Sequence, residues 1–373
     1  SVFGTRPEAI KMAPLVKQLE TESNVFSKVC VTGQHREMLD QVLNIFSIIP
    51  DYDLDVMKKE QNLTDITIKI LKKISTVYDE YRPDLILVHG DTTTSFVASL
   101  AAYYKQIKVG HVEAGLRTGN IYSPWPEEIN RKLTGAIAKY HFAPTNIARQ
   151  NLLNENTPDD KVFVTGNTVI DALEWVTQKI KRNKALEETI LAALPKINFT
   201  NKIVLVTGHR RENFGSGFEQ ICKAISNLAN SRKDLEIIYP VHLNPNVKKP
   251  VQKLLNKKEN IHLIEPQDYL SFCYLMNKSW LILSDSGGIQ EEAISLKKPV
   301  LVMREFTERE EALKLGAVRL VGSSQKIIVN SVMELFEDKK KYKKMILKSN
   351  PYGNGKAGKS ISSFLEKSFQ NEK

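Results

Sequence analysis

Long hydrophobic runs are missing from this sequence. No stretch approaches the ~20 apolar residues that a membrane-spanning helix needs, so we expect neither a transmembrane segment nor a membrane partner. No signal peptide is visible either, although the chain opens inside an expected strand, and we expect a few further residues upstream. The content of 42% hydrophobic and 26% charged residues is typical of a globular protein.

Cysteine is scarce as well. The three cysteines, Cys30, Cys222 and Cys273, are too widely spaced to form a disulfide framework or a zinc-binding pattern. The sequence therefore predicts a protein of the reducing cytoplasm.

Two common nucleotide-binding fingerprints are absent from the glycine-rich turn Ser286-Gly287-Gly288. It is not followed by the Gly-Lys-Ser/Thr of a Walker A loop, and it does not fit the GxGxxG pattern that binds NAD. The turn nevertheless joins a strand-like run to a helix-like run. Paired glycines there let backbone N–H groups approach an anion at a helix N-terminus. The alternative is a tight turn that simply needs glycine.

The net charge of +10 raises the question of a nucleic-acid partner. From Gln325 to the end there are eleven lysines and five acidic residues, so this helix-patterned tail carries more than half of the excess. No nucleic-acid motif or aromatic-interleaved basic ladder accompanies it, and a solvated helix face is the better interpretation. We expect no nucleic-acid partner; the remaining positive charge favours an anionic ligand such as a nucleotide diphosphate.

Short β-branched runs alternate with amphipathic stretches along all 373 residues. This alternation predicts parallel sheets covered by helices on both faces, which right-handed crossovers make doubly wound. The expected strands are 1–4, 28–33, 85–90, 108–113, 141–144, 162–166, 203–208, 235–241, 261–266, 280–285, 299–303 and 318–322. The clearest helix-like runs are 9–20, 35–46, 63–81, 217–230 and 286–296.

The two strand series predict two Rossmann-like domains that face a central cleft. We expect an N-terminal domain over residues 1–168 and a C-terminal domain over residues 169–354. The segment 355–373 contains a final helix, which we expect to return to the first domain. The carboxyl ends of the strands in both domains are the expected place for a ligand.

Three acidic residues follow strand-like runs in the first domain. Asp91, Glu113 and Glu127 lie in VHGDTTTS, HVEAGLRTG and SPWPEEINR, with His89 and His111 near the first two. Carboxylates collected in such loops indicate proton transfer, because moving a proton off carbon needs a base and then an acid. The alternative for each acid is helix capping, since Asp91 precedes a helix-like run and Glu127 follows a proline.

Other loops carry positive charge. Thr207–Asn213 holds His209 and two arginines after a strand, and guanidinium groups bind phosphate oxygens in pairs. Gly4–Glu8, with Lys11 one turn further on, is a similar turn in the first domain, and its cations are expected at the same phosphates. His35 and His262 look structural, whereas His242 fits either interpretation.

A resemblance to a known family rests on motifs from Phe3 to about Gly358. The sequence resembles the bacterial non-hydrolysing UDP-N-acetylglucosamine 2-epimerases in FGTRPEAIKMAPL, QHREMLDQVL, VHGDTTTS, GHVEAGLRTG, SPWPEEINR, GNTVIDAL, TGHRREN, PVHLNPNV and DSGGIQEEA. The resemblance implies a GT-B-like fold and a homodimer. It also implies reversible interconversion of UDP-GlcNAc and UDP-ManNAc for cell-surface polysaccharide, with no metal and no nicotinamide cofactor.

In the family, the C2 hydrogen and UDP leave to give a 2-acetamidoglucal, and UDP then adds back with a proton on the opposite face. The resemblance assigns acid–base work to Asp91, Glu113 and Glu127, and places His209 at the diphosphate or the leaving oxygen. The positions that match the UDP site are Arg6, Lys11, Gln267, Phe272, Ser286, Gly287, Gly288, Glu292 and Arg309.

The sequence departs from the family pattern at several positions. Glu310 replaces a usual proline, and we expect this acid to compete for the guanidinium of Arg309 and to weaken nucleotide binding. Some members bind a second UDP-GlcNAc as an activator; the matching positions are Gln34, Gln61, Glu127, Arg210 and His242. Glu37 and Glu60 stand where regulated members tend to have Gln and Arg, so we expect weak or absent cooperativity.

Alternatives from other classes remain open at this point. A GT-B glycosyltransferase shares the fold and the nucleotide site, but it has less use for three acids near C2. A hydrolysing epimerase differs by admitting water to the cleft. A non-enzymatic UDP-sugar sensor would have lost the acids, and Asp91, Glu113 and Glu127 are all present.

Overall fold

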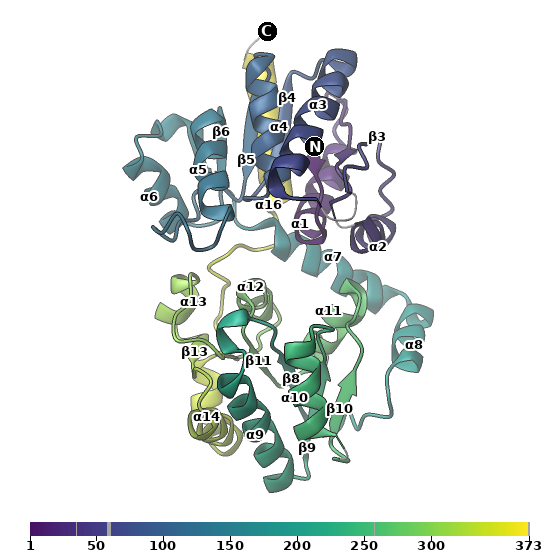
Figure 1. The fold of residues 1–373 in the computed structure, drawn as a ribbon, viewed down its shortest axis with the longest axis vertical. Helices are drawn as coiled ribbons and strands as arrows, with labels where there is room; N and C mark the ends of the chain where they lie inside the picture. Colours follow the sequence, from purple (N-terminus) through teal and green to yellow (C-terminus); the bar gives the residue numbers. More distant parts are fainter. Residues whose placement is uncertain (35, 58–60, 257, 372–373) are drawn as a thin grey trace. The chain divides into compact units, whose positions relative to one another are not determined.

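The chain forms two compact units in a computed structural model that describes residues 1–34, 36–57, 61–256 and 258–371 (Figure 1). Unit 1 comprises Ser1–Glu174 and the segment from Tyr352 onward, and unit 2 comprises Trp175–Pro351. These limits differ by a few residues from the boundaries expected at 168 and 354. The differences arise because helix α7, Thr168–Arg182, runs through the first boundary, and because Tyr352 accepts a hydrogen bond from the Asn167 amide of unit 1 (2.7 Å).

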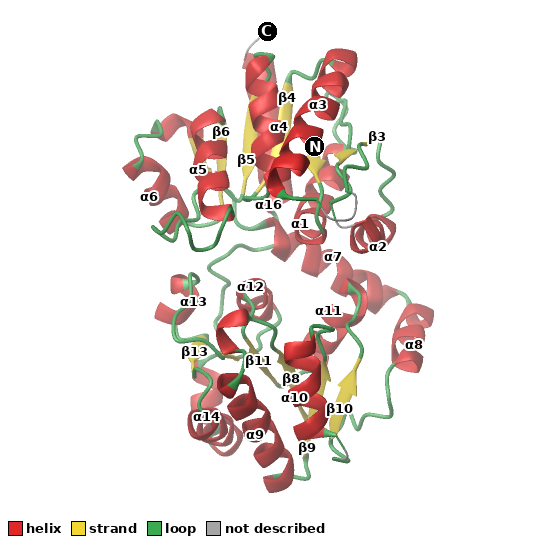
Figure 2. Ribbon diagram, viewed as in Figure 1, coloured by secondary structure: helices red, strands yellow, loops and turns green. Residues whose placement is uncertain are grey.

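Unit 1 alternates strands with helices (Figure 2). Its strands are β1 Val2–Phe3, β2 Cys30–Val31, β3 Tyr52–Asp53, β4 Leu85–His89, β5 Lys108–Val112, β6 Tyr140–Ala143 and β7 Val162–Val164. Its helices are α1 Arg6–Leu19, α2 Arg36–Phe46, α3 Leu63–Tyr81, α4 Thr93–Tyr104, α5 Glu127–Ile137, α6 Asn146–Asn154, the 3₁₀ turn η1 Asp159–Lys161 and α16 Ala357–Asn371.

The strands of unit 1 are parallel and run in the orders β1-β2-β3 and β4-β5-β6-β7. β1 also packs against β4, so β2 and β3 lie on one side of this pair and β5 to β7 on the other. Helix α1 contacts α2 and α16, while α4 contacts α3 and α5. One hydrophobic cluster lies between α3, α4 and the strands and includes Ile70, Val88, Val97 and Val109.

Unit 2 is built on one parallel sheet with the order β10-β9-β8-β11-β12-β13. Its strands are β8 Lys202–Thr207, β9 Leu235–Pro240, β10 Ile261–Ile264, β11 Leu281–Ser284, β12 Val300–Val302 and β13 Val318–Leu320. Its helices are α8 Lys184–Ala193, η2 Arg211–Asn213, α9 Ser216–Ser231, α10 Pro245–Leu255, α11 Tyr269–Lys278, α12 Gly287–Ser295, α13 Glu310–Lys314, α14 Gln325–Glu337 and α15 Lys339–Lys344. A buried cluster of strand residues such as Val204 and Leu283 packs on Phe218 of α9 and Val332 of α14.

These features confirm the predicted doubly wound α/β class, with two Rossmann-like units. The helix expected over 63–81 is found with those limits, capped by Asn62 and Asp65 in a reciprocal box. Helix α1 begins earlier than expected, because Thr5 caps it and Pro7 is accommodated in its first turn. The two-residue strand β3 was not expected, and too few of its side chains are apolar to give a strand signal.

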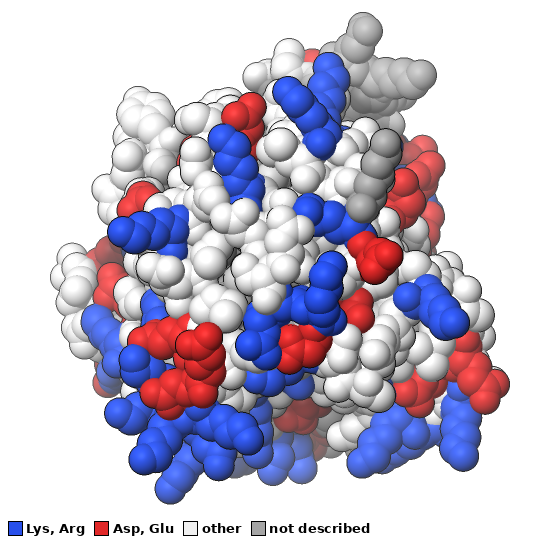
Figure 3. Space-filling view, turned by 90° about the horizontal axis from the view of Figure 1, so that it is seen from below, with Lys and Arg blue, Asp and Glu red and all other residues white. Residues whose placement is uncertain are grey.

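Charge is spread over the exposed surface. Figure 3 shows a face on which lysine and arginine side chains are interspersed with acidic ones. The five lysines of α15 are exposed, and Lys341 pairs with Glu334 of α14. Within the described residues, no helix combines the length and the hydrophobicity that crossing a membrane requires.

Candidate functional site

The strand order of unit 1 places two loops side by side. β1 and β4 pack together at the point where the order reverses, and ligands of open α/β sheets bind beside the carboxyl ends of strands at such a point. The loop after β1 carries Gly4, Thr5 and Arg6, and the loop after β4 carries Gly90 and Asp91. A Cβ on Gly4 would overlap Thr32 after β2, so glycine is needed for this close packing.

Glu8 joins these two loops. Its carboxylate is buried and accepts hydrogen bonds from the amides of Gly4 (3.1 Å) and Thr5 (2.8 Å). It also accepts from the hydroxyls of Thr92 (2.6 Å) and Ser95 (3.0 Å), in the loop and first turn after β4. Burial raises the pKa of Glu8, and these bonds oppose the rise. Glu8 was not predicted as a site residue. The Thr-x-x-Glu spacing, which is typical of a capping box, could have indicated it.

Glu113 follows β5 and meets a cation from α1. Its Oε2 forms a close ion pair with Lys11 Nζ and accepts a hydrogen bond from Asn167 Nδ2 (2.7 Å). His89 Nε2, at the end of β4, is 3.8 Å from the same oxygen. Glu113 has a φ of 61°, a left-handed conformation that is uncommon for residues other than glycine and that clusters at functional sites.

Asp91 lies beside a second cation. Its carboxylate pairs with Arg131 of α5, whose Nη1 is 3.3 Å from the fully buried Glu128. Asn130 donates to the backbone carbonyl of Asp91 (3.0 Å). Desolvation raises the pKa of Asp91, while the positive charge of Arg131 acts against this rise. Asp91 does not cap α4, because Thr92 is the capping residue.

Glu127 is the first residue of α5 and is half-buried. Its carboxylate makes no hydrogen bond or ion pair to another described residue, and the helix carries no side-chain cap at Pro126. In unit 1, Glu113 thus pairs with Lys11 and Asp91 pairs with Arg131, and the two pairs are close enough for the charges of Glu113 and Lys11 to affect the pKa of Asp91. Arg6 is the first residue of α1, directly after the loop that follows β1.

Unit 2 repeats this arrangement at the junction of β8 and β11. β9 and β10 lie on one side of this pair and β12 and β13 on the other, so the order again reverses. His209 and Arg210 follow β8, and Asp285 follows β11. The Asp285 carboxylate is fully buried and accepts hydrogen bonds from the amides of His209 and Arg210, both at 2.8 Å. Asp285 was not predicted as a site residue, because it is the last residue of an expected strand.

The glycine-rich turn also lies at this junction. Ser286 is the N-cap residue of α12, and its side chain does not cap the helix amides. A Cβ on Gly287 would lie 2.8 Å from Glu308 Oε1, whereas one on Gly288 would meet nothing within 4 Å. Thus the backbone N–H groups of this turn lie at the first turn of a helix, an arrangement that attracts anions.

Arg309 stands next to this turn. Its Nε donates to Glu291 (2.6 Å) and its Nη1 is 3.5 Å from Glu308. Glu310 instead forms an exposed pair with Lys314 (2.7 Å) as the first residue of α13. The expectation that Glu310 competes for Arg309 is therefore wrong, because its side chain turns along its own helix.

The remaining predicted residues are distributed around α11 and α12. Glu292 is buried and accepts a hydrogen bond from Tyr269 (2.8 Å). Gln267 donates to the carbonyl of Glu265 (2.7 Å), and Phe272 is half-buried on α11. His262 pairs with Glu236 at 2.6 Å across two neighbouring strands, which fits its structural interpretation.

The predicted activator positions fall in both units. Gln34 and Gln61 belong to unit 1, while Arg210 and the exposed His242 belong to unit 2, where the rings of His242 and His209 stack 5.4 Å apart. Glu37 is exposed. His35 and Glu60 lie outside the described residues.

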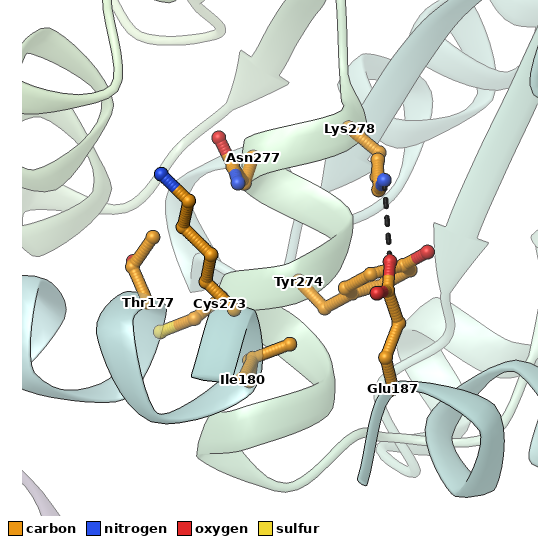
Figure 4. A pocket seen from close by; sticks show the side chains of 8 residues that line it. Thr177, Ile180, Glu187, Cys273, Tyr274, Asn277 and Lys278 are labelled. Atoms are coloured by element: carbon orange, nitrogen blue, oxygen red, sulfur yellow. Dashed lines mark ion pairs between the residues drawn. The ribbon is translucent and has the colours of Figure 1, made fainter. Parts of the chain in front are cut away.

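A separate cavity of about 230 Å³ lies between α7, α8 and α11 of unit 2 (Figure 4). Its lining includes Cys273 and an ion pair between Glu187 and Lys278 (3.4 Å). None of the predicted ligand-binding residues lines this cavity. Among the residues that the structure describes, no three His, Cys, Asp or Glu side chains gather as a metal site.

The strand orders and the two junctions are those of a two-domain, Rossmann-like α/β protein. The structure superposes on MurG from Acinetobacter baumannii with a TM-score of 0.58 over 98% of both chains; at 13% identity this shows the fold alone. The predicted GT-B-like, two-domain Rossmann fold is thereby confirmed.

Comparison of sequences identifies the family. Residues 17–366 match the family described as UDP-N-acetylglucosamine 2-epimerase. The chain is 59% identical to the enzyme of that name from Salmonella typhimurium over 357 residues, which cover 96% of this chain and 95% of the relative. It is also similar to the crystal structure of UDP-GlcNAc 2-epimerase from Neisseria meningitidis bound to UDP-GlcNAc, with a TM-score of 0.92, 54% identity and 98% coverage of both chains. The chain therefore belongs to the bacterial non-hydrolysing UDP-N-acetylglucosamine 2-epimerase family, and it is an isomerase.

Two buried histidines beside the unit 1 site make stability depend on pH. Burial lowers the pKa of His89 to about 4 and that of His111 to about 3, from an ordinary value of 6.5. Below pH 6.5 the unfolded chain therefore binds protons that the folded chain excludes. The contribution of each histidine to the free energy of unfolding should therefore fall by about 1.4 kcal/mol per pH unit as the pH drops from 6.5 to about 4, whereas Asp171, whose pKa burial raises to about 6, contributes in the opposite direction.

Urea unfolding at several pH values measures this slope. His111→Asn should reduce the number of protons taken up on unfolding in this pH range by about one. An unaltered slope in His111→Asn would mean that His111 is not held neutral in the folded chain.

Proposed function

We propose that this chain interconverts UDP-N-acetylglucosamine and UDP-N-acetylmannosamine by elimination and re-addition of UDP. The observation that carries the proposal is the pairing of Asp91 and Glu113 with Arg131 and Lys11 at the carboxyl ends of β4 and β5. Both acids are thus fixed in place by a cation, with the Asp91 side chain 25% exposed and the Glu113 side chain 7% exposed. Ligand-bound relatives support the choice of substrate, since the Neisseria enzyme was solved with UDP-GlcNAc.

The chemistry needs two proton-transfer groups. A base takes the proton from C2, the C2–H electron pair forms a C1=C2 double bond, and the C1–O bond breaks with its electrons passing to UDP. The resulting 2-acetamidoglucal then takes a proton on the other face of C2, and the UDP oxygen adds back to C1. Two faces require two groups, and this accounts for several carboxylates in one place.

Different acids suit different steps. The raised pKa of Asp91 favours it as a proton donor, because it keeps its proton to higher pH than an exposed aspartate. Glu113, oriented by Lys11 and Asn167, suits the base, and Glu127 is the third acid of the set.

The other predicted residues bind UDP. In unit 1, Arg6 and Lys11 are cations that suit phosphate oxygens, and in unit 2 His209 is a hydrogen-bonding group that suits them. Ser286, Gly287 and Gly288 offer the N-terminus of α12, and Glu292 accepts hydrogen bonds from the ribose. The remaining predicted UDP-binding residues are Gln267, Phe272 and Arg309. Unit 1 thus supplies acid–base groups, unit 2 supplies most UDP contacts, and no metal or cofactor takes part.

Cellular role and regulation complete the proposal. The enzyme acts in the cytoplasm, which fits three buried, free cysteines, and supplies N-acetylmannosamine-type sugar for cell-surface polysaccharide. We expect weak or absent cooperativity in UDP-GlcNAc, because the sequence has Glu60 where regulated members of the family tend to have arginine.

Replacement of each acid by its amide separates catalysis from binding. Asp91→Asn, Glu113→Gln and Glu127→Gln should each lower turnover by at least ~10²-fold, the usual scale for acid–base groups. UDP affinity should change much less, since other residues hold the phosphates. Proton NMR of the purified protein with UDP-GlcNAc alone follows UDP-ManNAc formation, and calorimetry measures UDP binding.

Asp159→Asn is the matched control, because Asp159 is an exposed acid that pairs with Arg149. Its turnover should equal that of the wild type. Near-normal turnover in all three site variants would refute the acid–base assignment.

A homodimer is supported by an apolar stripe on α5. Ile129 and Leu133 are 37% and 41% exposed and stand one turn apart, and Trp125 just before the helix is 63% exposed. Leu133→Glu should shift sedimentation from dimer to monomer by placing a charge in the interface. Ile327→Glu, at a 51% exposed position on α14, is the control and should stay dimeric. An unchanged dimer in Leu133→Glu would place the interface elsewhere.

A further inference from the structure

Asp285 has one carboxylate oxygen that its neighbours satisfy and one that they do not. Oδ2 accepts the two backbone N–H groups of His209 and Arg210 at 2.8 Å, which ties the loop after β8 to the end of β11. Oδ1 is buried and has no hydrogen-bond partner among the described residues. A buried acceptor without a donor costs about 1–3 kcal/mol, and more when charged, so its retention calls for a reason.

This oxygen lies near the imidazole of His209. His209 Nδ1 is 3.5 Å from Asp285 Oδ1, long for a hydrogen bond but within reach of a small ring movement. Hydrogen bonds of this kind are often long in free enzymes and tighten when ligand binds. The same carboxylate that fixes the backbone of the loop is therefore poised at the ring.

A face of the His209 ring is also covered. His242, after β9, stacks on His209 with the ring planes 15° apart, and its own Nδ1 accepts the Asn244 amide at 3.1 Å. Arg210 is the other charged group beside His209. Burial lowers the pKa of His209, His242 and Arg210 lower it further, and the charge of Asp285 opposes them. The carboxylate is thus the one neighbour that stabilises a protonated imidazole.

We propose that Asp285 is a positioning residue that accepts the Nδ1 proton of His209 and so presents Nε2 to the diphosphate of the substrate. The inference rests on the proposed function. When the C1–O bond breaks, its electron pair passes to the UDP oxygen, and negative charge grows on the diphosphate. An Nε2–H donor stabilises that charge, and the Asp285 carboxylate balances the positive charge that the ring carries. No proton leaves His209 in this step.

The alternative is that Asp285 only ties down the loop. Asp285→Asn distinguishes the two, because the amide oxygen still accepts from the amides of His209 and Arg210. Its NH₂ group, however, cannot accept a hydrogen bond from a protonated Nδ1, which disfavours the doubly protonated ring and removes the balancing charge. We expect turnover to fall about 10²-fold with an unchanged unfolding midpoint, and UDP affinity to be equal or higher. Asp338→Asn is the matched control, since Asp338 also accepts two backbone N–H groups, from Lys340 and Lys341.

Two readouts separate positioning from loop support. In a His209→Gln background, Asp285→Asn should have little further effect on turnover, because both residues act through one ring. In NMR titrations of the free enzyme, the His209 imidazole should titrate at lower pH in Asp285→Asn than in the wild type. An equal loss in both backgrounds, or an unmoved titration, would overturn the proposal in favour of loop support. If the wild type fails to epimerise UDP-GlcNAc, the proposed function falls, whereas the titration still reports on the pair.

Discussion

The reversal of strand order within each sheet is the constraint on which the rest of the structure depends. At β1 and β4, and again at β8 and β11, successive helices cross to opposite sides, and the loops after the two strands diverge. Each junction exposes backbone N–H groups and first-turn side chains that a continuous sheet would cover. Every loop to which we assign acid–base or phosphate contacts, apart from those after β5 and β12, around α5 and around α11, leaves a strand at one of these junctions.

Charged side chains at and near the junctions form ion pairs. Glu113 meets Lys11, Asp91 meets Arg131, and Arg309 meets Glu291, so that partly buried charges keep a partner. Removing one member of such a pair leaves an uncompensated charge and costs far more than an exposed pair contributes. Glu8 adds rigidity by joining the loops after β1 and β4 through neutral donors.

Much of this could be predicted from the sequence, and the failures have physical causes. Apolar runs located β4, β5 and β8 to β12, and periodicity located α3, because their burial is imposed locally. Strand β3 gave no such signal. The loops of the candidate site were predicted from acids and glycines after strands, but the partners Arg131, Asn167 and Asp285 were not. Contacts between residues far apart in the chain depend on strand order, which hydrophobic patterning does not specify. Glu310 was assigned to Arg309 because they are adjacent, whereas the helix directs it to Lys314.

Hydrogen exchange at C2 tests the account most directly. The enzyme and UDP-GlcNAc are incubated in D₂O without added NAD, and the UDP-ManNAc formed is analysed by NMR and mass spectrometry. Proton transfer through solvent-accessible carboxylates predicts deuterium at C2 of the product. UDP-ManNAc that carries only the original C2 hydrogen would contradict the elimination scheme and the role assigned to the acids.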